Sequence, residues 1–205
     1  VTLSSGGTNY VAGETLTIAG TSLGGVSPAN DVVIKIVTVT SVSKAITNFT
    51  WTGYASGGRY VAISLALFSM YSTNGTTWTA GGDLPAGTFS SIAAGTDSGV
   101  STLVATSESN TTAKSVNGGT TWTAGGNLPS SLNWESVTYG NSVFVAVGKG
   151  TGTTPSTSAA YSTNGGTSWV SANLPSAAWT GVAYGAGKFV AVATGTQTSA
   201  YSTSN

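Results

Sequence analysis

Three copies of one short motif constrain the fold of this 205-residue chain more than any other feature. The copies occupy residues 71–78, 114–122 and 161–169; each carries Ser-x-Asn-Gly, ends on tryptophan and is followed by Leu-Pro. Counted from their serines, Ser72, Ser115 and Ser162, the copies are spaced by 43 and 47 residues, and a step of 40 leads to the similar segment at Ser202. Steps of this length suit one four-stranded β unit each.

A second element recurs between the copies. Residues 134–140 lead through a Gly/Asn turn to 143–147, and residues 179–185 lead in the same way to 188–192. Short apolar runs joined by such turns predict β-hairpins. The segments 51–55 with 59–63 resemble this hairpin, and 89–92 with 103–106 form a degenerate copy, so each unit reads as hairpin, loop, strand, motif turn, strand and Leu-Pro.

The predicted fold class is all-β, because no segment shows a sustained helical period and the 29 glycines disfavour long helices. Residues 1–57 are expected to form a small β module, with strands near 14–18, 32–39 and 46–52. Trp51–Ala55 also suits the first strand of the array, which leaves that boundary open.

Residues 58–205 are expected to form about 3.5 propeller-like four-stranded units. A closed propeller needs about four to eight blades, so the array is predicted to be incomplete or open. Either the native chain continues past Asn205, or neighbouring chains cover its free strand edges.

Composition excludes several classes of function. The chain has no cysteine and no histidine, which removes disulfides, thiolate and imidazole metal ligands, and Ser–His nucleophilic systems. Six basic and six acidic side chains cancel, and no basic cluster exists to neutralise phosphates, so no nucleic-acid partner is predicted. The apolar run at 60–70 is too short to cross a bilayer. No membrane insertion, metal or cofactor is expected.

The motif has the spacing Ser-x-Asn-x-Gly-x-Thr/Ser-Trp and resembles the Asp-box of sialidases and other β-propeller proteins. That resemblance implies a turn that stabilises a propeller-like blade and lies away from any active site. Asparagine replaces the usual aspartate, and the first copy is one residue shorter, so its turn should differ. The matching residues are Ser72, Asn74 and Trp78, then Ser115, Asn117, Gly119 and Trp122, then Ser162, Asn164, Gly166 and Trp169.

An enzyme is not predicted. A sialidase grips its substrate's carboxylate with several arginines, and this chain has only Arg59. A generic glycosidase needs two carboxylates about 5 to 9.5 Å apart. No catalytic residue is therefore assigned, although Glu135, which follows a unit-opening tryptophan, is the carboxylate best placed to line a cleft. The six carboxylates fall at unrelated positions of different units: Glu14, Asp31, Asp83, Asp97, Glu108 and Glu135.

The aromatic residues that open the units are the candidate ligand contacts. They are Trp134 and Trp179, with Tyr139 and Tyr184 five residues further on. Exposed aromatic faces are what sugar-binding surfaces use. The alternative, which the repeat pattern favours, is that these residues form the core of the units.

The amino-terminal residues carry a second resemblance. The run 7–18, followed by Gly20, residues 23–25, Pro28 and residues 30–31, looks like a small β module of predicted structural proteins of tailed bacteriophages. The resemblance implies a non-enzymatic virion component, such as a tail fibre, baseplate protein or capsid-surface fibre. Its expected partners are other virion proteins, further copies of itself and a cell-surface glycan. The alternatives are a bacterial cell-surface or secreted glycan-binding adhesin and a fragment of a sialidase-like glycan-processing enzyme.

Overall fold

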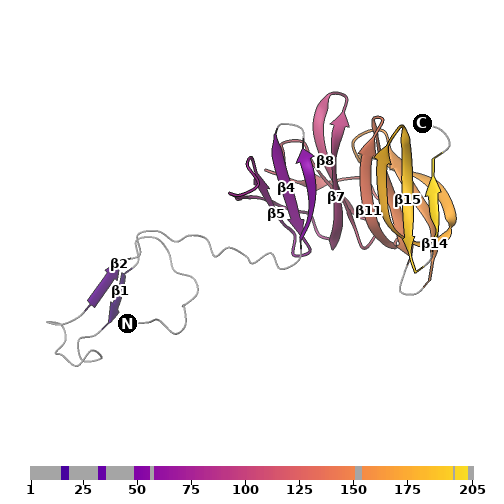
Figure 1. The fold of residues 1–205 in the computed structure, drawn as a ribbon. Helices are drawn as coiled ribbons and strands as arrows, with labels where there is room; N and C mark the ends of the chain where they lie inside the picture. The colour runs from indigo at the N-terminus through magenta and orange to yellow at the C-terminus, as the bar shows by residue number, and fades with distance from the viewer. Residues whose placement is uncertain are drawn as a thin grey trace. The chain divides into compact units, whose positions relative to one another are not determined.

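The computed structural model describes residues 15–18, 32–35, 49–55, 58–150, 154–195 and 197–202, and every regular element assigned among them is a β-strand. The chain divides into two compact units, Val1–Ala45 and Ile46–Asn205. We call the first the amino-terminal unit and the second the array (Figure 1). The described residues contain no helix long and apolar enough to span a membrane.

In the amino-terminal unit, two short strands form an antiparallel pair. Strand β1 (Thr15–Ile18) lies beside β2 (Val32–Lys35), with Leu16 opposite Ile34. Both strands fall inside the segments predicted from their β-branched, alternating sequences. The remaining residues of this unit lie outside the described part of the chain.

The first repeat unit of the array is a four-stranded antiparallel sheet. It contains β3 (Phe49–Ala55), β4 (Arg59–Ser64), β5 (Phe68–Ser72) and β6 (Thr79–Asp83), in that order across the sheet. Strand β3 contains Trp51–Ala55, the segment that the sequence could place in either unit. It pairs with β4 and is therefore the first strand of the array. The boundary lies between residues 45 and 46, earlier than the position after residue 57 that the sequence suggested.

The second unit repeats this arrangement. It contains β7 (Phe89–Asp97), β8 (Val100–Ser107), β9 (Thr112–Ser115) and β10 (Thr123–Ala124), again with each strand hydrogen-bonded to the next along the chain. In both units the motif connects the third strand to the fourth, as the repeat pattern predicts.

The third and fourth units share a strand. Strands β11 (Asn133–Gly140), β12 (Val143–Gly150) and β13 (Ser156–Ser162) are followed by the long β14 (Val170–Gly185). The first part of β14 pairs with β13 as the outer strand of the third unit. Its second part, from Ala178, pairs with β15 and so opens the fourth unit. The described fourth unit is completed by β15 (Lys188–Thr194) and β16 (Ser199–Tyr201).

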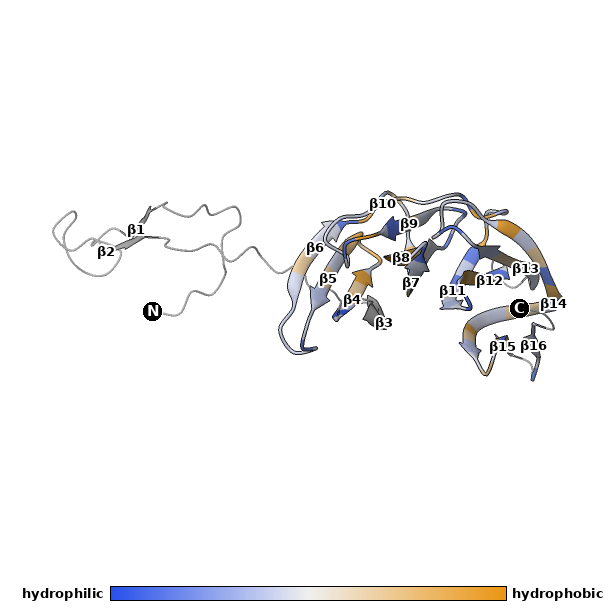
Figure 2. Ribbon diagram, turned by 90° about the horizontal axis from the view of Figure 1, so that it is seen from above, coloured by the Kyte–Doolittle hydropathy of each residue, from blue (hydrophilic) through white to orange (hydrophobic). Residues whose placement is uncertain are grey.

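The sheets of the array stand face to face along an arc, with β3, β7 and β11 on the concave side and β6 and β10 on the convex side (Figure 2). Successive side chains of a strand point to opposite faces, so each sheet contributes to the core on either side of it. Leu103 packs towards the first unit, beside Val61 and Ile63, whereas its neighbour Val104 packs towards the third, beside Trp134.

The fold is thus all-β, with a small amino-terminal β unit followed by an open array of propeller-like four-stranded units. Three core clusters hold the array together, and each lies between two consecutive units. The array therefore depends on contacts between neighbouring units, as in other repeat proteins.

Candidate binding surface

We call the three motif copies the box turns: Ser72–Trp78, Ser115–Trp122 and Ser162–Trp169. In the second turn, the buried Ser115 Oγ accepts hydrogen bonds from the backbone N–H groups of Asn117 (3.4 Å) and Gly119 (3.0 Å). Asn117 Oδ1 accepts from Ser115 Oγ (3.0 Å) and from the N–H of Thr121 (2.9 Å). Gly119 has a φ of +82°, a conformation that L side chains rarely adopt. The serine, asparagine and glycine therefore act as a turn-closing set, and the third turn repeats these contacts.

The asparagine of each longer box turn also supplies a donor to the turn. Asn117 Nδ2 donates to Thr121 Oγ1 at 2.8 Å, and Asn164 Nδ2 donates to Ser168 Oγ at 2.8 Å. A carboxylate could keep this contact by accepting from the hydroxyl instead, since a threonine or serine O–H rotates freely.

Substituting Asn117 tests this account of the turn. We expect Asn117→Ala to lower the free energy of unfolding by about 1 to 2 kcal/mol, because several partly exposed hydrogen bonds are lost. We expect Asn117→Asp to change it by less than about 0.5 kcal/mol at pH 7, because the acceptor oxygen stays in place. Urea unfolding measures both; equal losses for the two variants would show that the Nδ2 donor, rather than Oδ1, holds the turn.

The first box turn is built differently, as its shorter sequence predicts. Asn74 Oδ1 accepts from the N–H groups of Thr76 (2.9 Å) and Thr77 (2.8 Å), and Trp78 Nε1 donates to Gly75 of its own turn at 3.2 Å. In the second turn, Trp122 Nε1 instead reaches the preceding unit. The tryptophan of the shorter turn therefore makes its hydrogen bond within its own turn.

The two longer box turns bind to the unit before them, one at the outer strand β6 and the other at the residues just after β10. Gly82 N–H donates to the carbonyl of Gly119 at 3.1 Å, and Gly126 N–H donates to the carbonyl of Gly166 at 2.8 Å. A Cβ atom at Gly81 would overlap Gly119 O, so the close approach requires glycine there. The polar motif is therefore used for contacts between units.

Trp134 and Trp179, two of the predicted ligand contacts, are fully buried. The Nε1 of each donates to a carbonyl four residues earlier, Trp134 to Ser130 and Trp179 to Pro175, both at 3.0 Å. Neither indole has a face left for a ligand, so both are core residues, as the alternative interpretation held.

The other two predicted contacts, Tyr139 and Tyr184, are half-buried between neighbouring inner strands. The ring of Tyr139 lies against Gly95, and the ring of Tyr184 lies against Gly140, so that a Cβ atom at either glycine would overlap the ring. Tyr139 OH also donates to the carbonyl of Thr96 at 3.0 Å. The four aromatic residues therefore form two copies of one packing arrangement rather than a single site.

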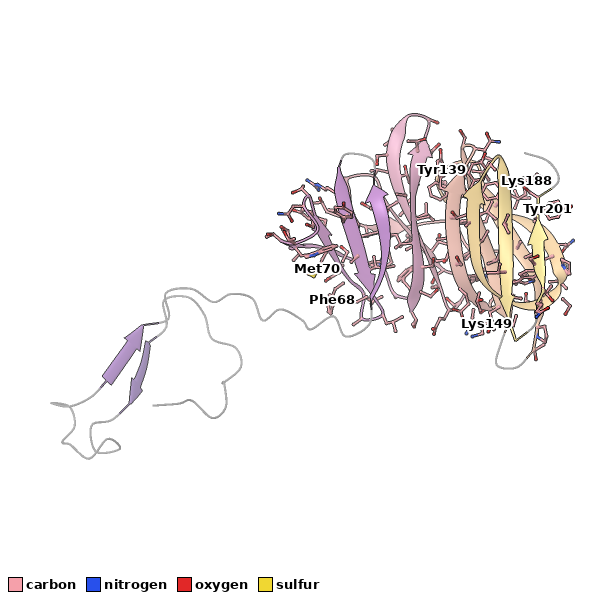
Figure 3. The ribbon with its side chains drawn as sticks, in the orientation of Figure 1. Phe68, Met70, Tyr139, Lys149, Lys188 and Tyr201 are labelled. Carbon is pink, nitrogen blue, oxygen red and sulfur yellow. The ribbon has the colours of Figure 1, made fainter. Side chains whose placement is uncertain are left out.

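The charged residues of the array that the structure describes make contacts within and between units. Arg59 Nη1 donates to Thr120 Oγ1 at 3.2 Å, and its guanidinium lies 4.4 Å from the ring centre of Tyr71. Glu135 pairs with Lys149 at 3.4 Å. Lys149 and Tyr139 lie at opposite ends of their hairpin (Figure 3). Among the described residues, no group of three or more histidine, cysteine or acidic side chains could hold a metal.

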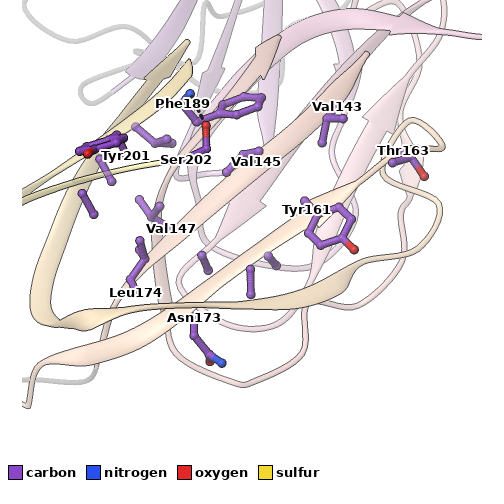
Figure 4. Close-up of a pocket in the computed structure, with 16 residues that line it drawn as sticks. Val143, Val145, Val147, Tyr161, Thr163, Asn173, Leu174, Phe189, Tyr201 and Ser202 are labelled. Carbon is purple, nitrogen blue, oxygen red and sulfur yellow. Dashed lines mark hydrogen bonds between the residues drawn. The ribbon is translucent and has the colours of Figure 1, made fainter. Parts of the chain in front are cut away.

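A cavity of about 610 Å³ between the third and fourth units is the site that the sequence did not predict. Figure 4 shows side chains of β12, β13 and β14 on one side and those of β15 and β16 on the other. The signal in the sequence is a substitution: the third unit has Ala159 three residues before its box serine, where the first two units have Ser69 and Thr112. The apolar lining of the cavity includes Val145, Val147, Ala159, Tyr161, Leu174 and Phe189.

No protein-family model matches the chain, and no curated protein matches it. Among solved structures, the chain is similar to the crystal structure of the computationally designed Ika8 protein, with a TM-score of 0.52 and 13% identity over 71% of this chain and 43% of that one. It also matches YCF48 bound to D1 peptide, with a TM-score of 0.44 and 17% identity over 70% of this chain and 49% of that one. The chain thus spans less than half of each of these two structures, and the likeness to the designed protein concerns the fold alone.

Proposed function

We propose that this chain is a non-enzymatic structural protein of a tailed-phage virion, part of a tail fibre, baseplate or capsid-surface fibre, in which the array is a scaffold for host recognition. The resemblance of residues 7–31 to phage structural modules supports the virion assignment. The packing of the array supports the scaffold.

The observation that carries the proposal is that the repeated residues make contacts between consecutive units. The two longer box turns bind the preceding unit through the Gly82 and Gly126 amides, and inner-strand tyrosines pack on glycines of the preceding unit. In a repeat array each unit contacts only its neighbours, so contacts of this kind hold every unit against the next. A stiff scaffold of this kind suits a fibre, and its variable loops are free to differ between hosts.

The charges support a non-enzymatic role. Arg59 contacts the second box turn, so its guanidinium is committed to holding two units together. Glu135, the carboxylate best placed for a cleft, is neutralised by Lys149. An anionic sugar would have to displace the Arg59 contacts to bind at this guanidinium.

Three measurements on the purified protein and on particles from its source test this function. We expect antibodies against the array to label virions in electron micrographs, native mass spectrometry to show an oligomer, and no sugar release from sialosides or other glycans. A free monomer that binds a glycan array and is absent from particles would instead identify an adhesin. Release of sugar from any glycan would show an enzyme and overturn the proposal.

A further inference from the structure

Each box turn contains an asparagine followed directly by a glycine. In this dipeptide the glycine nitrogen can attack the asparagine Cγ, which forms a succinimide ring and releases ammonia; water then opens the ring and leaves a carboxylate. Because glycine has no Cβ atom to shield its nitrogen, the copies share the same intrinsic chemistry and differ in their surroundings. The dipeptides are Asn74-Gly75, Asn117-Gly118 and Asn164-Gly165.

The second box turn polarises the side-chain carbonyl that this reaction attacks. Asn117 Oδ1 accepts hydrogen bonds from Ser115 Oγ at 3.0 Å and from the N–H of Thr121 at 2.9 Å. Attack at Cγ moves negative charge onto Oδ1, and donors that are already in place stabilise an oxyanion as it develops. The hydrogen bonds that close the turn are therefore also suited to promote attack on this amide.

The attacking nitrogen is engaged in the shorter turn and free in the longer ones. Gly75 N–H donates to Ser72 Oγ at 2.9 Å. In the second turn the serine instead bonds Gly119, and the N–H of Gly118 donates to no group within the described part of the chain. The third turn has the same arrangement. The additional residue of the longer turns thus frees the nitrogen that would attack.

A guanidinium distinguishes the second turn from the third. Arg59 Nη1 donates to the backbone carbonyl of Asn117 at 3.5 Å, and Thr120 Oγ1 donates to the same oxygen at 3.0 Å. This carbonyl belongs to the peptide that contains the Gly118 nitrogen, so a negative charge on that nitrogen is shared with the oxygen. A cation bonded to the oxygen favours the deprotonated, nucleophilic form of the peptide.

The third turn has the opposite charge at the corresponding place. Asp97, at the end of β7 in the second unit, lies against Gly165, as Arg59 of the first unit lies against Gly118. A carboxylate there disfavours a negative charge on the Gly165 nitrogen and disfavours a second carboxylate on Asn164. The same dipeptide is therefore activated in one turn and restrained in the next.

Two further contacts separate the longer turns. Lys114 Nζ donates to Thr167 Oγ1 at 2.8 Å, so a cation also reaches the third turn. The carbonyl of Asn164 itself, however, accepts from the backbone N–H of Thr167 at 3.2 Å, in the place of a guanidinium. Gly165 is buried whereas Gly118 is half-buried, which gives water better access to the second turn.

We propose that Asn117-Gly118 is a self-modification site, at which the folded protein converts Asn117 into a carboxylate through a succinimide. The Gly118 nitrogen gives up its proton to water and bonds to Asn117 Cγ; the bond from Cγ to Nδ2 breaks, and Nδ2 leaves as ammonia. Water adds to a ring carbonyl and breaks its bond to the nitrogen, so that one water is consumed for each ammonia released and nothing is oxidised or reduced.

Ring opening at Cγ gives aspartate, and opening at the backbone carbonyl gives isoaspartate. Either product places a carboxylate beside Arg59 and so adds an ion pair between the first and second units. The proposal does not depend on the virion assignment, since it rests on contacts within the array.

Peptide mapping by mass spectrometry tests the proposal. The full 205-residue protein is incubated at neutral pH in water enriched in heavy oxygen, so that every ring opening during the incubation is labelled. We expect conversion at Asn117 to be at least about tenfold faster than at Asn164 or Asn74, a conservative figure for one preorganised donor. In urea this difference should vanish, because the dipeptides are identical. Equal rates at Asn117 and Asn164 in the folded protein, or a difference that persists in urea, would overturn the proposal.

Variants of the two neighbouring charges locate the cause. Arg59→Gln should slow conversion at Asn117 at least about tenfold, and Arg59→Lys, which keeps the charge, should restore part of the rate. Asp97→Ser removes the carboxylate beside Gly165 and should accelerate conversion at Asn164 by about threefold to tenfold. This gain does not depend on a disruptive change, and circular dichroism checks the fold of each variant. Unchanged rates in both Arg59→Gln and Asp97→Ser would refute the proposed site.

Discussion

Replacing Trp134 by alanine is expected to lower the free energy of unfolding by about 3 to 5 kcal/mol. The side chain is fully buried between the second and third units, in one core with Val104 and Phe144. Its Nε1 bond to Ser130 at 3.0 Å fixes the segment that enters β11. Alanine would remove the indole from this core and leave a cavity that strands on both sides hold open, because each is paired within its own sheet.

Urea unfolding followed by circular dichroism measures this loss, and Trp78→Ala is the matched control. Trp78 is half-buried, belongs to none of the three core clusters and donates only to its own turn. Its replacement should cost less than about 1 kcal/mol. Equal losses of unfolding free energy in the two variants would show that the buried Trp134 contributes no more to stability than the half-buried Trp78.

Gly140→Ala is the second substitution with a large expected effect. The new Cβ atom would overlap the ring of Tyr184, which lies against Gly140 from the next inner strand. We expect a loss of about 1 to 3 kcal/mol, because overpacking forces the ring or the strand to move. Differential scanning calorimetry should show a lower melting temperature.

Gly185→Ala is its control at the corresponding position of the next unit. Gly185 also follows the tyrosine of an inner strand, but a Cβ atom there would have nothing within 4 Å, and its φ lies outside the left-handed region. Alanine should therefore be neutral or stabilise by up to about 1 kcal/mol, by restricting the unfolded chain. A destabilisation equal to that of Gly140→Ala would mean that strand geometry, and not the tyrosine contact, demands the glycine.

The repeat units were predictable because their signals are local. Period-two alternation and turn residues define the hairpins. The match of Trp51–Ala55 to the first strands of later hairpins also indicated that this segment could belong to the array. The box turns were predictable for the same reason, since Ser115 and Asn117 bond backbone groups within four residues. What the turns bind to was not predictable, because Gly82 and Gly119 are brought together by the stacking of two sheets.

The candidate site depended on information that a local pattern does not contain. Trp134 and Tyr139 stand five residues apart in a repeated hairpin, and only the stacking of units shows that one is enclosed in the core and the other packs on Gly95. The cavity is lined by β12, β13 and β14 on one side and by β15 and β16 on the other, and only the folded array brings these strands together. The match of residues 59–63 to residues 143–147 already aligned Val145 with Val61, and the strand pairings agree, since each valine lies opposite the tyrosine before its box serine.

Strand β14 belongs to two sheets, and this has a consequence for how the array can change its length during evolution. The first two joints, at residues 84–88 and 125–132, are loops, where an inserted residue is absorbed at the surface. At the third joint the chain passes from Ala177 to Ala178 while still extended and paired. One inserted residue there must be absorbed as a β-bulge within a paired strand; otherwise it exchanges the faces of the residues downstream and turns the indole of Trp179 away from the core. We therefore expect changes of length to be tolerated at the first two joints and to destabilise the array at the third.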